Sequence, residues 1–267
     1  KFFNYFNKKN YLKNLNRNIF FSSKGHDAPA LYSCLYGLNI IKETKFLKLR
    51  RVNGLDGHPD ISIDGIEANT GSLGMGISKA KGIAWTKKYL KLKGDVIVVI
   101  GDGEFQEGQI FESLQNAAHQ NITNLIVIMD HNKIQSSEYV KKIIDLGNLK
   151  KKILSFGWHV ERCDGHDFKK ISQALNKIKK IRTKPKFIIA DTIKGKGISA
   201  MEHTNVMKKN KYYTWHSGAP NDEIFIKSQN ELIKQIEIIS KKNKFDLPVL
   251  KNISTNKKLK AKVFEVH

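Results

Sequence analysis

The chain has 267 residues, of which 40% are hydrophobic and 9% aromatic, so it can bury the core of one large α/β domain or two small ones. This composition excludes a disordered chain, and no stretch approaches the roughly 20 apolar residues that cross a membrane. The formal net charge of +22 is large, but the lysines are spread along the chain without a nucleic-acid-binding motif. We therefore expect anionic small molecules such as sugar phosphates as ligands, and neither nucleic acid nor membrane as a partner.

The two cysteines, Cys34 and Cys163, are far apart, and neither belongs to a CxxC pair. This spacing argues against a disulfide framework and against a zinc site. It is compatible with a reducing compartment, and we expect a cytoplasmic protein.

The first half of the chain predicts a strand and two helices, at residues 19–22, 28–38 and 77–90. His26 follows the strand directly, and Pro59 holds His58 in an extended loop. The glycines of 65–76 precede the second helix, where a backbone can approach an anion closely. Taken alone, His26 is more often a turn or capping residue, and a glycine-rich segment of this kind more often serves helix packing.

The centre of the chain predicts two neighbouring parallel strands, because the runs 96–100 and 125–129 are short, apolar and β-branched. A helix between them starts near Glu104. Asp102 and Asn132 follow the ends of the two strands, so we expect them side by side at one edge of the sheet. Their oxygen atoms suit a hard cation such as Mg2+ or Ca2+, although two ordinary turns would use the same residue types.

The second half continues the alternation of strands and helices. The predicted helices are 145–156, 167–179 and 221–241. Residues 157–160 lead into a predicted strand that ends before Asp164, and residues 186–193 form a second predicted strand. We expect an α/β fold, a parallel sheet with helices on both faces. The expected domain covers residues 1–240, and residues 241–267 form a basic C-terminal tail.

Several motifs, in this order, resemble the transketolase family. They are SKGHDAPALYS, GHP, TGSLG, GDGEFQEGQIFES, NLIVIMDHNKIQ, FGWHVERCDGHD and TIKGKG. The chain is most similar to the N-terminal half of these enzymes, which some organisms make as a separate subunit, and the resemblance implies a thiamine-diphosphate-binding fold. The family's N-terminal SGH-type segment has no match, so we expect either a fragment that lacks this segment or a departure from the family.

The resemblance implies a role for individual residues. The metal ligands would be Asp102, Asn132 and the backbone carbonyl of Ile134. The histidines that bind substrate hydroxyls and assist proton transfers would be His26, His58 and His216. The residues that border the cofactor would be Gly71, Ser72, Leu73, Gly101, Asp102, Gly103, Glu104, Asn132, Lys194 and His216. Glu107 and Glu112 match acidic positions that couple paired sites near a dimer axis, although exposed helix-face glutamates are a simpler interpretation.

The reaction implied is transfer of a two-carbon ketol (glycolaldehyde) unit from a ketose phosphate to an aldose phosphate, with thiamine diphosphate and Mg2+ or Ca2+ as cofactors. The family activates its cofactor with a glutamate on a second, pyrimidine-binding domain, and nothing in this chain matches that domain. We therefore expect the partner to be a C-terminal transketolase subunit, the assembly to be a dimer of heterodimers, and the chain alone to be inactive.

Two alternatives remain open. One is a subunit of another thiamine-diphosphate enzyme, similar to deoxyxylulose-phosphate synthase or a 2-oxo acid dehydrogenase, although His26 and His58 favour ketose substrates. The other is a non-catalytic basic binding protein with the same fold, and retention of Asp102 and Asn132 argues against it.

Overall fold

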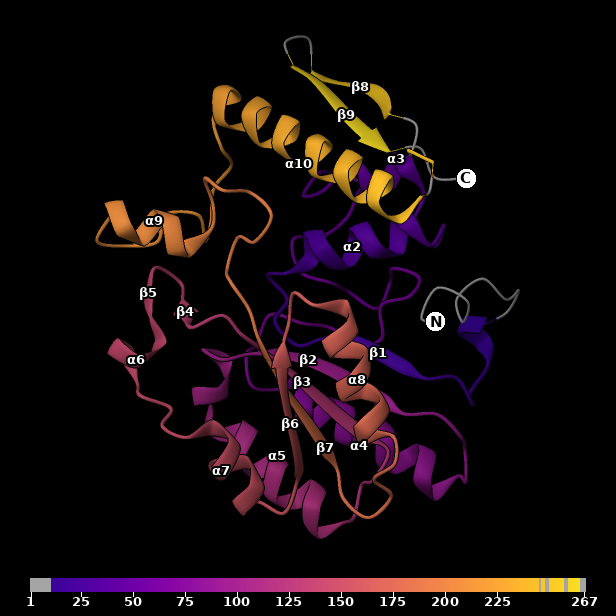
Figure 1. Cartoon of the computed structure of the whole chain (residues 1–267). Coiled ribbons are helices and arrows are strands. Elements are labelled where there is room, and N and C mark those ends of the chain that lie inside the picture. The colour runs from indigo at the N-terminus through magenta and orange to yellow at the C-terminus, as the bar shows by residue number, and fades with distance from the viewer. Residues whose placement is uncertain (1–10, 245, 248–249, 257–258, 265–267) are drawn as a thin grey trace. The chain divides into compact units, whose positions relative to one another are not determined.

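The computed structural model describes residues 11–244, 246–247, 250–256 and 259–264 (Figure 1). The chain divides into two compact units. The first consists of the residues up to Lys133 together with Val140–Thr192, and the second consists of Ile134–Tyr139 together with the residues from Ile193 onward. No helix among the described residues is long and apolar enough to span a membrane.

The first unit is built on a five-stranded sheet in the order β1-β2-β3-β7-β6. The strands are β1 (Ile19–Ser22), β2 (Val96–Gly101), β3 (Leu125–His131), β6 (His159–Asp164) and β7 (Lys186–Asp191). Every pairing in the sheet is parallel, so all five carboxyl ends lie at the same edge. This arrangement confirms the fold class predicted from the apolar runs.

Helices cover both faces of this sheet. Side chains along a strand alternate between the two faces, so each strand contributes to a core on either side. Val96, Val98 and Ile100 face one core, which α4 (Gly76–Tyr89), α5 (Gly108–His119) and α7 (Leu149–Ser155) complete. Ile97 faces a second core, completed by α8 (Phe168–Ile178). The parallel strands are therefore buried on both sides, as their continuous apolar runs predicted.

A third, smaller core lies in the same unit, around Tyr32 and Leu35 of α2. The remaining short elements of the unit are η1 (Tyr11–Lys13), α2 (Ala28–Gly37), α3 (Glu43–Phe46), η2 (Glu104–Gln106) and α6 (Val140–Ile143). This core anchors the segment that follows β1, which carries His26 and His58.

The second unit has its own small core around Ile134, Val206 and Tyr213. Its elements are β4 (Ile134–Gln135), β5 (Glu138–Tyr139), α9 (His203–Lys209), α10 (Asp222–Asn243), β8 (Leu250–Asn256) and β9 (Leu259–Phe264). Residues 241–267, which we expected to form a tail, contain the end of α10 and the antiparallel pair β8–β9.

Two predicted helices begin later than the sequence indicated. The helix predicted at 145–156 begins at Leu149, because the Asn148 side chain caps it by accepting a hydrogen bond from the Lys151 N–H at 3.0 Å. The helix expected near Glu104 begins at Gly108 as α5, since residues 104–106 form the 3-10 turn η2. The other predicted helices and strands lie within a few residues of observed ones. The sequence did not predict α3, α6, α9, β4, β5, β8 or β9.

Candidate functional site

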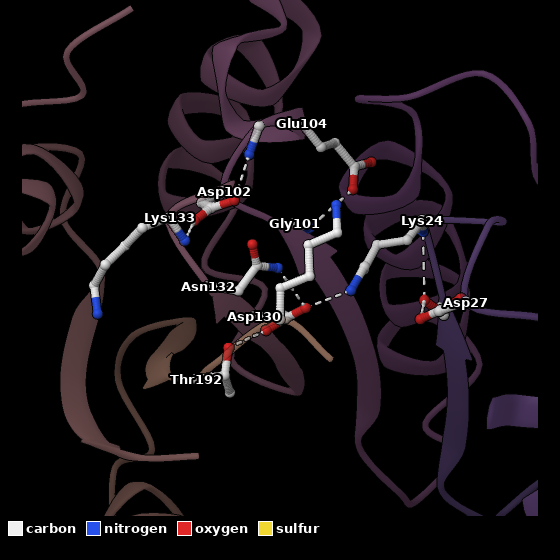
Figure 2. Close-up of polar contacts among 12 residues, drawn as sticks. Lys24, Asp27, Gly101, Asp102, Glu104, Asp130, Asn132, Lys133 and Thr192 are labelled. Atoms are coloured by element: carbon white, nitrogen blue, oxygen red, sulfur yellow. Dashed lines mark hydrogen bonds and ion pairs between the residues drawn. The ribbon is translucent and has the colours of Figure 1, made fainter. Parts of the chain in front are cut away.

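Asp102 and Asn132 meet at the carboxyl edge of the sheet, as predicted. Gly101 at the end of β2 pairs in register with Asp130 in β3, so Asp102 and Asn132 both leave the sheet at this edge, within two residues of that pair. Asp102 is 2% exposed and Asn132 is 8% exposed. Figure 2 shows both side chains at this edge, together with Asp130 and Lys133. The two residues lie thirty positions apart in sequence and share one small region.

The carboxylate of Asp102 is held by two backbone N–H groups. Lys133 donates to Oδ2 at 2.5 Å, and Gly103 donates to Oδ1 at 2.8 Å. Burial raises the pKa of Asp102 above its usual range, while the two hydrogen bonds act in the opposite direction. A cation beside this carboxylate would favour its ionised form, because an opposite charge offsets the cost of burial.

Glu104 joins three segments of the first unit through one buried carboxylate. The side chain is 3% exposed and accepts hydrogen bonds from the N–H groups of Gly74 at 2.8 Å and Gly101 at 3.2 Å, and from the Ser23 hydroxyl. Burial raises the pKa of Glu104 as well. Glu104 thus braces the glycine-rich loop against β1 and β2, and its direct contact with a cofactor stays a prediction.

An ion pair at this edge was not predicted from the sequence. Lys24 Nζ lies 2.5 Å from Asp130 Oδ2, and the two side chains are only 12% and 24% exposed. Asp130 also accepts hydrogen bonds from Asn132 Nδ2 at 3.0 Å and from the Thr192 hydroxyl. Burial opposes the ionisation of Asp130, but the pKa falls below its usual value because of Lys24 and these hydrogen bonds. The sequence carried no local signal for this pair, because it depends on β1 lying in the same sheet as β3.

The loops that carry His26, His58 and Gly71 converge at Gly25. Gly25 has a φ of +66°, and a Cβ atom at this position would lie 2.6 Å from His58 Cδ2 and 3.2 Å from the Gly71 nitrogen. His26 and His58 are both exposed, so their rings are accessible to a ligand. The structure therefore brings these two predicted histidines and the glycine-rich loop into one neighbourhood.

The predicted cofactor-binding backbone at Gly71, Ser72 and Leu73 is exposed. Glu107 packs closely against Gly74, the residue that follows this segment. A Cβ atom on Gly74 would lie 2.6 Å from Glu107 Cβ. Glu107 and Glu112 are themselves exposed. This exposure agrees both with a subunit-coupling role and with the simpler interpretation as solvated glutamates.

The second unit carries the remaining predicted residues. Lys194 Nζ lies 3.1 Å from Nδ1 of His216, and both the partial burial of His216 and this ammonium group lower the pKa of the imidazole. The backbone N–H of Lys194 donates to Nδ1 of the buried His203 at 3.0 Å, which fits a structural role for His203. Ile134, the predicted third metal ligand, is buried as the first residue of β4.

The donor set at the sheet edge fits a hard divalent cation. A buried carboxylate and a carboxamide, from Asp102 and Asn132, are oxygen ligands of the kind that Mg2+ and Ca2+ prefer. The exposed glycine-rich loop precedes the N-terminus of α4, where backbone N–H groups suit an anion such as a diphosphate. The residues present therefore fit a metal-diphosphate group.

Residues 2–211 match a family described as the transketolase, thiamine diphosphate binding domain. The chain is 34% identical over 232 residues to an apulose-4-phosphate transketolase subunit of Phocaeicola vulgatus, covering 86% of this chain and 80% of that protein. It is 39% identical over 182 residues to the 6-deoxy-6-sulfo-D-fructose transketolase subunit SqwG of Clostridium sp. strain MSTE9, covering 67% of this chain and 66% of the relative.

A solved structure supports the same assignment. The crystal structure of transketolase from Campylobacter jejuni superposes with a TM-score of 0.68 and 29% identity, covering 91% of this chain but only 36% of that one. A parallel sheet with this edge, together with these matches, defines the thiamine-diphosphate-binding part of a transketolase. The chain belongs to the transketolase family and contains the family's thiamine diphosphate binding domain.

Proposed function

We propose that this chain is the diphosphate- and metal-binding subunit of a split transketolase. In this role it takes part in moving a two-carbon ketol unit from a ketose phosphate to an aldose phosphate. The observation that carries the proposal is the meeting of Asp102 and Asn132 at the carboxyl edge of β2 and β3. Relatives of similar length are named as transketolase subunits, which supports a divided enzyme.

The metal would be held by the oxygen atoms of Asp102 and Asn132, with the Ile134 carbonyl as the proposed third protein ligand. Mg2+ is the proposed ion, with Ca2+ as a substitute, because both take oxygen ligands. The diphosphate would lie against the exposed backbone of residues 71–73. Thiamine diphosphate, when bound, supplies the nucleophilic carbon of the reaction. The protein's part is to hold and orient it.

The histidines would orient substrate hydroxyls and carry protons. His26 and His58 are exposed on neighbouring loops of the first unit. Partial burial and the charge of Lys194 favour the neutral form of His216 in the second unit, and a neutral imidazole is suited to accepting a proton. Lys194 supplies a positive charge that suits the phosphate of a substrate or cofactor.

The proposed partner is a C-terminal transketolase subunit that carries the pyrimidine-binding domain and its activating glutamate. We propose a dimer of heterodimers in the cytoplasm, acting in carbohydrate metabolism of the pentose phosphate type. Glu107 and Glu112 would couple the paired sites, since both are exposed on or beside α5.

A substrate panel tests the proposed function. The chain is mixed with its partner subunit, thiamine diphosphate and Mg2+, and ketose phosphates or pyruvate are offered as donors with aldose phosphates as acceptors. Ketol transfer that requires both subunits is the expected result. Turnover of pyruvate without ketose turnover would instead favour a subunit similar to deoxyxylulose-phosphate synthase or a 2-oxo acid dehydrogenase. Full ketol transfer by this chain alone would overturn the split-enzyme proposal.

A further inference from the structure

Asp130 is the centre of a cluster in which three donors converge on one carboxylate. Lys24 Nζ approaches Oδ2 at 2.5 Å, Asn132 Nδ2 donates to the same oxygen at 3.0 Å, and the Thr192 hydroxyl donates to Oδ1. Figure 2 shows the three side chains pointing at Asp130 from different segments. Lys24 follows β1 and Thr192 follows β7, so the cluster ties three strand ends of the sheet together.

The cluster determines which way the Asn132 amide faces. An ionised carboxylate only accepts hydrogen bonds, so the amide group of Asn132 can satisfy Asp130 only through its nitrogen. Figure 2 shows this nitrogen turned toward Asp130 and the amide oxygen turned to the side of Asp102. If the amide were reversed, its two N–H groups would face the Asp102 side and repel a cation there.

We propose that Asp130, itself fixed by Lys24 and Thr192, is a positioning residue that holds the carboxamide oxygen of Asn132 toward the metal. This inference rests on the proposed function, because it assumes that Asn132 is a metal ligand. Asp130 touches neither substrate nor cofactor in this role. It acts through Asn132, as the hydrogen-bonded partners of metal ligands do in other metal sites.

The ion pair between Lys24 and Asp130 restricts the rotation of the Asp130 carboxylate. A carboxylate with one partner can turn about its own side-chain bonds, whereas Asp130 is held on both oxygens, by Lys24 and Thr192. The fixed carboxylate then orients the amide of Asn132, because Asn132 can only be the donor in this hydrogen bond. Loss of such a partner in other metal sites typically weakens metal binding by about 10- to 100-fold.

The test measures metal-dependent binding of thiamine diphosphate by calorimetry in the assembled pair of subunits. Asp130→Asn should weaken Mg2+-dependent binding by about 10- to 100-fold, because either end of the new amide can face Asn132. The double variant Lys24→Met with Asp130→Asn should weaken binding to the same extent. It avoids leaving a lysine buried without its counter-charge, so it keeps the test valid if the single variant folds poorly.

Asp191→Asn is the matched control, since Asp191 ends the neighbouring strand β7 and pairs with Arg162 at 2.6 Å. It removes the same charge from the same edge, and its affinity should stay within about twofold of the original protein. A second readout is the side-chain amide NMR signal of Asn132 in the full chain, assigned with Asn132→Asp. This signal should move further in Asp130→Asn than in Asp191→Asn, because Asp191 contacts the neighbouring His131 and not Asn132 itself.

The outcomes separate the two proposals. Binding by the original protein, with Asp130→Asn equally tight or weakened no more than Asp191→Asn, would overturn the positioning role and leave the proposed function intact. Absence of metal-dependent binding in the original protein, with both subunits folded and associated, would overturn the proposed function and the positioning role with it.

Discussion

At the scale of single residues, neighbouring side chains determine how readily a carboxyl group of this chain ionises. Asp191 is the clearest case, because it receives two hydrogen bonds from Arg162, at 2.6 and 2.7 Å, and lies 2.9 Å from Nδ1 of His131. Burial alone would raise the pKa of this carboxyl, but Arg162 and His131 lower it to about 2. The network therefore favours the ionised carboxylate.

This shift predicts how stability depends on pH. Since the pKa of Asp191 is lower in the folded state than the ordinary 3.8, its contribution is present above pH 3.8 and is lost as the pH falls through about 2. Asp191→Asn should reduce the free energy of unfolding at pH 7 by about 1 kcal/mol, a value discounted for its partial exposure. Chemical denaturation between pH 7 and about pH 2.5 should show this difference shrinking below about pH 4.

A control separates the network from a general loss of charge. Asp145→Asn removes an exposed carboxylate that accepts a hydrogen bond from the Gly147 N–H. If the two variants showed the same difference at every pH, the special role of the Asp191 network would be wrong.

His216 gives a second prediction at this scale. Its pKa is lowered first by partial burial and then by Lys194, whose Nζ lies 3.1 Å from Nδ1. Lys194→Met should raise the pKa of His216, because the imidazolium form would no longer face a positive charge. NMR titration of the His216 ring, assigned with His216→Gln, measures this directly. An unchanged or lower pKa in Lys194→Met would contradict the assigned cause.

At the scale of elements, close approach of backbone segments shapes the candidate site. Gly25→Ala should destabilise the protein by about 1 kcal/mol or more, because a φ of +66° disfavours alanine and the new Cβ would clash with His58. Gly82→Ala is the matched control, since Gly82 lies inside α4 and, apart from its chain neighbours and the helix's own backbone, nothing lies within 4 Å of its Cβ position. It should stabilise by about 0.5–1 kcal/mol. Thermal denaturation of both variants tests the pair, and equal shifts of the same sign would contradict it.

The elements also show which features could be predicted. Strands β2 and β3 were found because their runs are apolar and end in turns, and α8 was found because Asp167 caps it through the N–H groups of Lys169 and Lys170. The start of α7 was placed wrongly, because the apolar periodicity continues upstream of the Asn148 cap. Periodicity reports which face is buried, whereas a cap decides where the helix begins.

Only part of the site could be predicted from the sequence, because some of its contacts depend on which strands are neighbours in the sheet. Asp102 and Asn132 follow from parallel strand order, which a sequence can indicate. The Lys24–Asp130 pair and the Glu104 brace depend on β1 lying beside β2, and nothing local in the sequence of β1 specifies that neighbour. The motif resemblance named Glu104 as a residue bordering the cofactor, but it did not name Lys24, Asp130 or Thr192, which hold the neighbouring Asn132.

At the scale of the whole molecule, the chain is the thiamine-diphosphate-binding part of a transketolase and covers 36% of the Campylobacter jejuni enzyme chain. Our proposal assigns the rest of the reaction to a partner subunit. Ketol transfer by this chain without the partner should therefore be absent, and addition of the partner should restore it in proportion to the complex formed. Size-exclusion chromatography with coupled activity assays of the fractions would show whether activity follows the complex.

The most direct test of the account is calorimetric titration of thiamine diphosphate with Mg2+ into the assembled subunits, with and without Asp102→Ala. We predict binding that requires both Mg2+ and Asp102, because this buried carboxylate is the proposed charged ligand of the metal. Asp145→Ala, which removes an exposed carboxylate, should bind as the original protein does. Binding that persists in Asp102→Ala or without a divalent metal, or no binding at all by folded and associated subunits, would contradict the account.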